Sequence, residues 1–325
     1  MSSRPRSPTS SRRVSAKAEQ QGASPPLVTA AAGILPAAGG AVCYGVATVL
    51  GRHLADAGVP SAAALGYRFS IAAICLALLL MLRRVPLRPR PGEWLRIVAL
   101  GAIGYTLEST LFYFSLQRGT AAACILLFYA YPAVVTAIDL VRGREPANRM
   151  TFGALALSVG GTAVLVASGR DVSISTAGIA LALGSAVIYA LYLLVGREMG
   201  RRTDAMTAAC WVAVGAAASC LGRGAITGQL ADPVGHRLAI VAYGVVTAAA
   251  FSLTFLALTR VGASRTAIIG TLEAVSAVIL AAAFLGEDIT GVQVVGGLAV
   301  VAAAVIIAAV HRNEVRRGDE PAATV

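Results

Sequence analysis

GGAVCYGVATVLGR, at residues 39–52, returns as GSAVIYALYLLVGR at residues 184–197, an offset of 145 positions. The two segments share the closing Gly-Arg and several small residues, and Tyr44 aligns with Tyr189. Similarity at a fixed period indicates an internal structural repeat. The chain is therefore predicted to contain two copies of one folding unit.

The correspondence continues along both copies. LFYFSLQRG at residues 111–119 aligns with LTFLALTRV at residues 253–261, at an offset of 142. At the same offset, Tyr131 aligns with Glu273. The two copies together account for most of the 325 residues.

The composition identifies the solvent in which the repeats fold. Hydrophobic residues make up 57% of the chain and charged residues 13%, and the mean hydropathy is +0.75. A soluble domain is only about half apolar, whereas apolar runs of about 20 residues, the length that spans a bilayer as a helix, recur along this chain. We expect an all-α integral membrane protein.

The apolar runs predict ten transmembrane helices, five in each copy. We place them at approximately residues 30–51, 60–82, 96–116, 119–140, 150–168, 174–195, 205–222, 238–258, 263–285 and 289–310. Because five is odd, the second copy must enter the membrane from the opposite side. The sequence thus predicts two inverted five-helix repeats.

The repeat boundaries divide the chain into four parts. We expect the first repeat at residues 27–170 and the second at residues 171–312. Residues 1–26 are rich in Ser, Pro and Arg, which predicts a disordered basic tail. Residues 313–325 are expected to form a second tail.

Basic residues predict the orientation, because cytoplasmic loops carry an excess of Lys and Arg. With the N-terminus inside, 21 of the 27 basic residues fall on the cytoplasmic side, five fall on the outer side, and Arg68 lies within a span. Both termini are therefore expected in the cytoplasm of a cell whose inner or plasma membrane holds the protein. The net charge of +11 is explained by topology, so no nucleic-acid partner is expected.

One long segment carries a family resemblance: GASRTAIIGTLEAVSAVILAAAFLGEDITGVQVVGGLAVVAAAVII, at residues 262–307. With its mid-helix Leu-Glu, its Leu-Gly-Glu turn and its Gly-rich closing helix, it resembles the ten-helix EamA-type permeases of the drug/metabolite transporter superfamily. The chain departs from that pattern where Glu273 precedes Ala274 instead of Pro. The resemblance implies efflux or exchange of amino acids or similar small polar metabolites, with no cofactor.

Three ionisable side chains lie well inside predicted spans: Arg68, Glu108 and Glu273. Each costs about 2.5–3.5 kcal/mol at the bilayer centre on insertion scales, so it needs a partner, a cavity or a function. Counted from the span ends, the three lie at similar depths, which favours a polar centre for substrate binding or coupling. The alternative is a structural Arg68–Glu108 pair, with Glu273 bonded to a neighbouring helix.

A proton-coupled mechanism follows as a hypothesis. One base faces two acids in this set, and a carboxyl group without a cationic partner in a medium of low dielectric can exchange protons near neutrality. Glu273 or Glu108 would carry that proton.

Tyrosines are the other candidate site residues. Tyr44 and Tyr189 occupy equivalent positions in the two repeats, and Tyr131 also lies within a span. We expect them to line a cavity, although packing or lipid-facing aromatics are the common alternative. The five cysteines lie in apolar runs without C-x-x-C spacing, so no metal site is expected.

Paired glycines predict close helix packing. Gly39-Gly40, Gly160-Gly161 and Gly296-Gly297 match the small-residue faces that allow membrane helices to approach each other.

Other functional classes fit the sequence less well. An enzyme is not expected, because the chain has no H-E-x-x-H motif and no aspartate pair within a span. A channel or a helical scaffold remains an alternative. The function that we predict is a secondary transporter that moves a small molecule across the lipid bilayer by alternating access. The sequence leaves the oligomeric state open.

Overall fold

The computed structural model describes residues 26–116, 118, 121–144, 148–167, 174–230, 235–285 and 289–319. Its elements are helices: α2 (Pro26–Asp56), α3 (Ser61–Leu82), α4 (Trp94–Ala99), η1 (Leu100–Tyr105), α5 (Thr106–Leu116), α6 (Ala121–Phe128), α7 (Tyr131–Val141), α8 (Arg149–Ala167), α9 (Thr176–Arg202), α10 (Ala205–Thr227), α11 (Arg237–Arg260), α12 (Ala263–Gly270), α13 (Leu272–Leu285) and α14 (Gly291–Asp319).

These helices supply ten segments that are long and apolar enough to cross a membrane. The prediction of an all-α membrane protein with ten spans is confirmed. The predicted tail at residues 1–26 lies outside the described residues, except for Pro26. At the other end, α14 continues as a helix to Asp319, past the predicted start of the second tail at residue 313.

Three of the spans are not single α-helices. The third consists of α4, a π-helical turn (η1) and α5, the fourth of α6 and α7, and the ninth of α12 and α13. The other seven spans are α2, α3, α8, α9, α10, α11 and α14. π-Helical turns and discontinuous helices are frequent at functional sites in membrane proteins.

Helix pairing follows the symmetry of an inverted repeat. In the first repeat the spans are α2, α3, α4–α5, α6–α7 and α8, and their equivalents in the second are α9, α10, α11, α12–α13 and α14. The structure packs α3 on α10, α7 on α12 and α8 on α14, so that these spans meet their own equivalents. It also packs α2 on α11 and α5 on α9, which are equivalent pairs. Exchanging the two repeats leaves this pattern unchanged.

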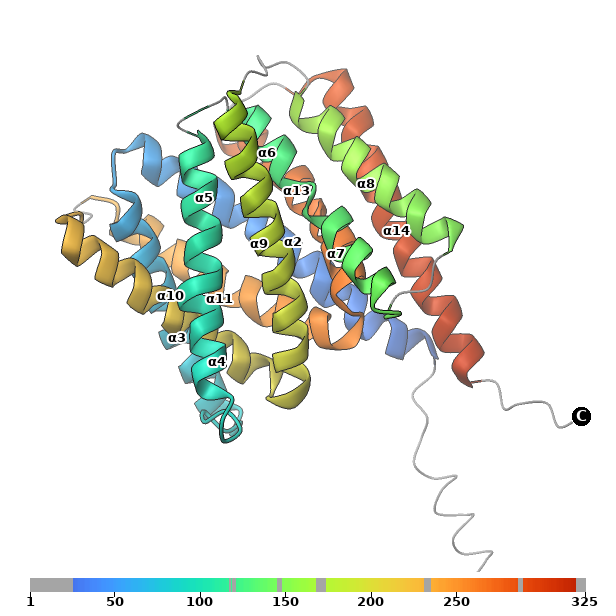
Figure 1. Cartoon of the computed structure of the whole chain (residues 1–325), viewed down its shortest axis with the longest axis horizontal. Coiled ribbons are helices and arrows are strands. Elements are labelled where there is room, and N and C mark those ends of the chain that lie inside the picture. Colours follow the sequence, from blue (N-terminus) through green and yellow to red (C-terminus); the bar gives the residue numbers. More distant parts are fainter. Residues whose placement is uncertain are drawn as a thin grey trace, which may run out of the picture.

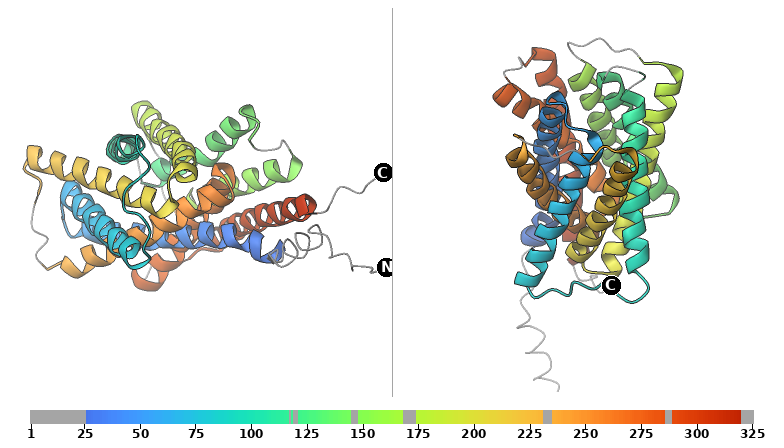
Figure 2. Two further views of the ribbon diagram at one scale, coloured as in Figure 1. Left: turned by 90° about the horizontal axis from the view of Figure 1, so that it is seen from below. Right: turned by 90° about the vertical axis from the view of Figure 1, so that its left-hand side faces the viewer.

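The two ends of the described chain lie on the same side of the helical bundle. Figure 1 shows the start of α2 and the end of α14 at the lower side, where α4 begins and α9 ends. Figure 2 shows the same arrangement from two further directions. This agrees with an even number of spans.

Glycines allow the close contact between α8 and α14. A methyl group on Gly161 would lie 2.8 Å from the carbonyl oxygen of Gly296, and one on Gly296 would lie 2.5 Å from the backbone nitrogen of Leu165. The close helix packing predicted from paired glycines is therefore found at this interface. Gly160 differs, because its added methyl group would meet nothing within 4 Å.

Candidate functional site

The breaks in spans four and nine occur at equivalent positions. The first break is at Tyr129 and Ala130, between α6 and α7, and the second is at Thr271, between α12 and α13. At the repeat offset of 142, Tyr129 aligns with Thr271. Each break begins a new helical segment, and the first turns of α7 and α13 contain Tyr131 and Glu273.

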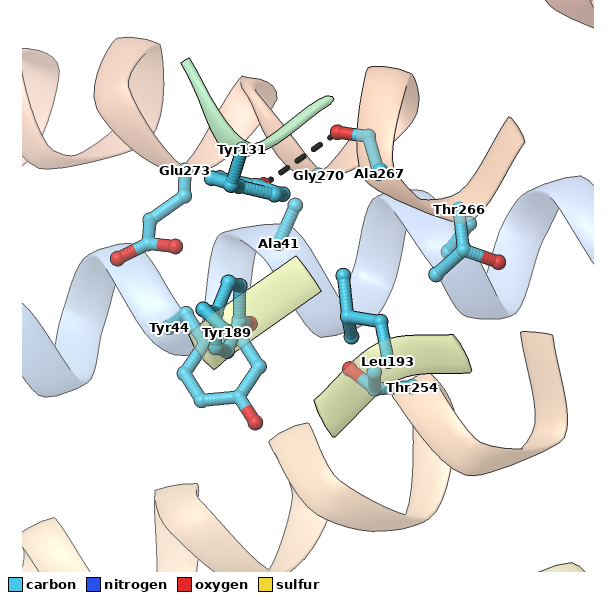
Figure 3. Close-up of a pocket in the computed structure, with 11 residues that line it drawn as sticks. Ala41, Tyr44, Tyr131, Tyr189, Leu193, Thr254, Thr266, Ala267, Gly270 and Glu273 are labelled. Carbon is cyan, nitrogen blue, oxygen red and sulfur yellow. Dashed lines mark hydrogen bonds between the residues drawn. The ribbon is translucent and has the colours of Figure 1, made fainter. Parts of the chain in front are cut away.

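A cavity lies beside these two breaks. Its polar lining comes from Tyr44 (α2), Tyr131 (α7), Tyr189 (α9), Thr254 (α11), Thr266 (α12) and Glu273 (α13). Small and apolar residues such as Ala41 and Leu193 complete the wall. Figure 3 shows the side chains from these helices converging on one space.

The lining reproduces the repeat symmetry. Tyr44 and Tyr189 are equivalent residues of the two repeats, and Tyr131 and Glu273 are another equivalent pair. Four of the polar side chains that line the cavity thus form two pairs, each related by the repeat symmetry. Binding sites of transporters built from inverted repeats form at such an interface, near the midplane of the bilayer.

The cavity is nearly closed in this conformation. The cavity has a volume of only about 20 Å³, which is room for about one water molecule. An amino acid is much larger than a water molecule. The helices around the cavity must therefore separate before a metabolite of that size can enter.

Glu273 gives the cavity its charge. It is half-buried, and its Oε1 atom accepts a hydrogen bond of 3.2 Å from the Thr48 hydroxyl group. The lining includes no Arg or Lys, and within the described part of the chain no ion pair to Glu273 is found. A negative carboxylate among aromatic rings suits a positively charged group, through an ion pair and cation–π contact.

The tyrosines differ in the hydrogen bonds that their hydroxyl groups make. Tyr131 donates a hydrogen bond of 3.3 Å to the backbone oxygen of Ala267, as Figure 3 shows. Its ring lies edge-on to that of Tyr189, with 4.8 Å between the ring centroids. The buried hydroxyl group of Tyr44 has no hydrogen-bond partner among the described residues. An unpaired buried hydroxyl costs stability and is available to a ligand.

Arg68 lies outside the cavity lining and is held by α11. Its Nε atom donates to the Thr247 hydroxyl group and one terminal nitrogen donates to the Tyr243 hydroxyl group, both at 2.7 Å. The guanidinium carbon also lies 4.3 Å from the centroid of the Tyr243 ring. These contacts take the place of the Arg68–Glu108 pair considered from the sequence, which is not found among the described residues.

Glu108 links spans three and six. Its Oε1 atom accepts a hydrogen bond of 3.2 Å from Ser185 on α9, and its Oε2 atom accepts one of 2.8 Å from Ser109. The carboxyl group is buried in the first turn of α5, directly after the π-helical turn. Glu108 does not line the cavity.

Aromatic rings connect Arg68 to the cavity. The chain of neighbouring rings runs from Phe69 beside Arg68 through Tyr105 and Tyr192 to Tyr189, with centroid separations of 5.1, 5.7 and 5.8 Å. The rings thus form a continuous packed path between Arg68 and the cavity.

A buried carboxylate that sequence reasoning missed is Asp139, near the end of α7. Its Oδ2 atom accepts a hydrogen bond of 3.3 Å from the backbone of Ser264 and lies 3.5 Å from Arg197. A further bond of 2.9 Å joins the hydroxyl groups of Thr136 and Ser264. These contacts hold together the ends of spans four, six and nine on one side of the membrane.

Asp139 and Arg265 were missed for the same reason. Each lies within a few residues of a predicted span end, where a charged side chain is expected to reach water. The structure instead buries both. In the described residues, no group of three His, Cys, Asp or Glu side chains is placed to hold a metal ion.

Comparison with known proteins gives a family and several relatives. A family model described as the EamA-like transporter family matches residues 31–167 and again residues 176–309. A threonine/homoserine exporter, RhtA, of Salmonella typhimurium is 31% identical over 204 residues, and RhtA of Escherichia coli (strain K12) is 30% identical over 207 residues.

Each of these alignments covers 60% of this chain and 63% of the relative, so the chain spans less than two thirds of the length of the exporters that it matches. A solved crystal structure superimposes with a TM-score of 0.74 over 87% of this chain and 98% of the other, at 18% identity. That likeness concerns the fold alone.

Proposed function

Because the chain belongs to the EamA-like transporter family of the drug/metabolite transporter superfamily, we propose that it is a secondary transporter that exports a small polar metabolite by alternating access. The observation that carries this proposal is the cavity lined by two equivalent pairs of residues, Tyr44 with Tyr189 and Tyr131 with Glu273. A site on the symmetry axis can be opened to either side by the same motion of one repeat against the other.

The repeats are the moving parts in this proposal. Residues 27–170 and residues 171–312 rock around the cavity, and the breaks in spans four and nine absorb part of the change. The multi-pass protein lies in the cell membrane. The distribution of basic residues supports an orientation with both termini in the cytoplasm.

The substrate that we propose carries an ammonium group. Glu273 would accept its hydrogen bonds while the faces of Tyr44 and Tyr189 shield its charge. The unpaired hydroxyl group of Tyr44 would donate to a carboxylate or hydroxyl group on the same molecule. An amino acid has both features, and the named substrates of the RhtA relatives, threonine and homoserine, belong to this class.

Arg68 and Glu108 have coupling functions in this proposal. Neither touches the cavity, but Arg68 ties α3 to α11 and Glu108 ties α5 to α9, which are contacts between the two repeats. Glu273 would bind either the substrate ammonium group or a proton, and this competition would couple export to proton entry.

A passive channel is the competing function. A cavity of about 20 Å³ supports a carrier, because an open pore would need a continuous path for its solute.

Metabolite profiling tests the export proposal. Cells that overproduce the protein should accumulate one class of ammonium-bearing metabolite in the medium, and cells with Glu273→Gln at equal membrane abundance should not. Glu198→Gln is the matched control, since it changes a partly exposed carboxylate outside the cavity. Identical media from wild-type and Glu273→Gln cells would argue against export through this site.

A further inference from the structure

A second cavity lies on the side of the molecule where α2 begins and α14 ends. It is a groove of about 310 Å³ between the start of α4, the end of α7 and the end of α9. Figure 1 shows these three helix ends at the same side of the bundle. Its charged lining consists of Glu93, Arg96, Arg142, Arg144, Glu198 and Arg202.

The groove has more arginines than carboxylates. Arg144 pairs with Glu198 at 2.9 Å, and Glu93 is shared by Arg202 at 3.4 Å and Arg96 at 3.7 Å. Both glutamates are thus already engaged.

Arg142 has no carboxylate partner among the described residues, so four guanidinium groups face two carboxylates. Each guanidinium group carries five N–H donors, and most of them are left for an anion.

An apolar stripe leads from the bilayer into this groove. Ile179, Leu183, Val187, Leu191 and Val195 follow one another at four-residue intervals along α9 and are each 37–41% exposed. The stripe is roughly 24 Å long, at a rise of about 1.5 Å per residue. Its last residue, Val195, also lines the groove, together with Leu194 and Met199.

Exposed apolar side chains flank the groove as well. Val141 at the end of α7 is 90% exposed, and Trp94 at the start of α4 is 53% exposed. A tryptophan at this level is typical of the membrane interface. The groove therefore lies where headgroups meet hydrocarbon, and an occupant can contact the arginines and the stripe at the same time.

We propose that this groove binds the phosphate headgroup of an anionic phospholipid whose acyl chain lies along the α9 stripe. Phosphate matches the fork of N–H donors that an arginine presents. Basic pockets between transmembrane helices on the cytoplasmic side suit anionic lipid headgroups. The stripe reaches the groove at Val195, so an occupant with an acyl chain can use both features, whereas a soluble anion would contact the arginines alone.

The bound lipid joins the two repeats. Arg96 and Arg142 belong to the first repeat and Arg202 to the second, so one phosphate in the groove bridges them. We expect such a lipid to raise the unfolding temperature of the purified protein.

Lipid titration of the full chain in neutral detergent tests this inference. Phosphatidylglycerol should bind at least about tenfold more tightly than phosphatidylcholine with the same acyl chains, as measured by native mass spectrometry, and should raise the unfolding temperature. The Arg142→Gln, Arg144→Gln double variant should lose this preference. The matched control, Arg88→Gln with Arg90→Gln, removes two exposed arginines from the α3–α4 link outside the groove and should keep it.

Three results would overturn the inference. Equal loss of phosphatidylglycerol binding in both double variants would mean general attraction to a basic surface. Equal stabilisation by inorganic phosphate or glycerol phosphate would mean a site for soluble anions. Full retention of the preference by the groove variant would place the lipid elsewhere. If that double variant does not fold, Arg142→Gln alone decides, because it leaves no buried carboxylate unpaired.

Discussion

Tyr131 and Glu273 occupy equivalent positions in the two repeats, yet only one of them can be charged. Symmetry provides two similar positions beside the cavity, and the difference between the two side chains places a single negative charge there. A site of this kind can hold one cation at a time. That property is what exchange of a proton for a substrate requires.

The first prediction concerns the charge of Glu273. Glu273→Gln should weaken binding of an ammonium substrate roughly ten- to hundredfold, because a hydrogen bond to a charged group contributes about 1.5–3 kcal/mol. It should also abolish export driven by an imposed pH gradient, since an amide cannot carry the proton. Export from proteoliposomes with and without the gradient measures both effects. A gradient response that survives in the variant would remove Glu273 from the coupling mechanism.

The second prediction concerns the Tyr44 hydroxyl group. Because this buried hydroxyl group has no partner among the described residues and therefore costs stability, Tyr44→Phe should raise the unfolding temperature slightly in the absence of substrate. The KM for substrate should rise about two- to tenfold, as expected for one neutral hydrogen bond. Tyr67→Phe, on α3 outside the cavity, is the control. An unfolding temperature that falls in Tyr44→Phe would show that the hydroxyl group is structural.

Single residues also show how far the sequence could predict this site. The alignment of Tyr44 with Tyr189 predicted a shared position, because equivalence between repeats can be read without coordinates. The position of Arg68 within a span was predicted from the sequence. Its contacts with Tyr243 and Thr247 were not. Counting residues gives depth in the membrane and says nothing about the rotation of a helix about its axis. Asp139 was missed because it lies near the end of span four, where a shift of one helical turn decides whether a side chain reaches the membrane interface or stays in the protein interior.

At the scale of elements, glycine sets how closely α8 and α14 approach. Gly161→Ala should destabilise the protein by about 1–3 kcal/mol, the usual cost of overpacking, because its methyl group meets the backbone of Gly296 at 2.8 Å. Gly160→Ala, one residue away, meets nothing within 4 Å and should have no such cost. Thermal unfolding in detergent compares the two variants, and equal shifts would refute this account of the interface.

The network around Asp139 ties three helix ends together, and its strength can be compared with that of a surface pair. Arg197→Gln leaves Asp139 buried without its cationic partner and should cost about 2–3 kcal/mol, somewhat below the usual range for a broken buried pair. Arg144→Gln breaks an exposed pair with Glu198 and should cost about 0–1 kcal/mol. Urea or thermal unfolding of both variants measures the difference. A larger loss in Arg144→Gln would contradict this ranking.

A sequence signal exists for the break in span four but not for the break in span nine. Spans four and nine read as continuous apolar runs, and hydropathy does not distinguish one long helix from two short ones. Pro132 signals the first break, because proline fits the first turn of a helix. The second copy has Ala274 at the equivalent position, so the break at Thr271 becomes visible only in the structure.

At the scale of the whole molecule, the count of spans and the repeat determine the architecture. Ten spans follow from apolar runs alone, because a run of about 20 apolar residues has the length at which a helix crosses the bilayer with its backbone hydrogen-bonded. The pairing of equivalent helices follows from the odd number of spans in each copy. The closure of the cavity could not be predicted, since it depends on how the two repeats are tilted relative to each other.

Counterflow in proteoliposomes tests the central claim, a carrier whose substrate site is the cavity at Glu273. Vesicles that contain wild-type protein and are loaded with the unlabelled amino acid that metabolite profiling identifies should take up its labelled form transiently above its equilibrium level. The Glu198→Gln control should show the same overshoot, and Glu273→Gln should not. Equilibration without an overshoot in wild type, or an overshoot unchanged in Glu273→Gln, would contradict the account.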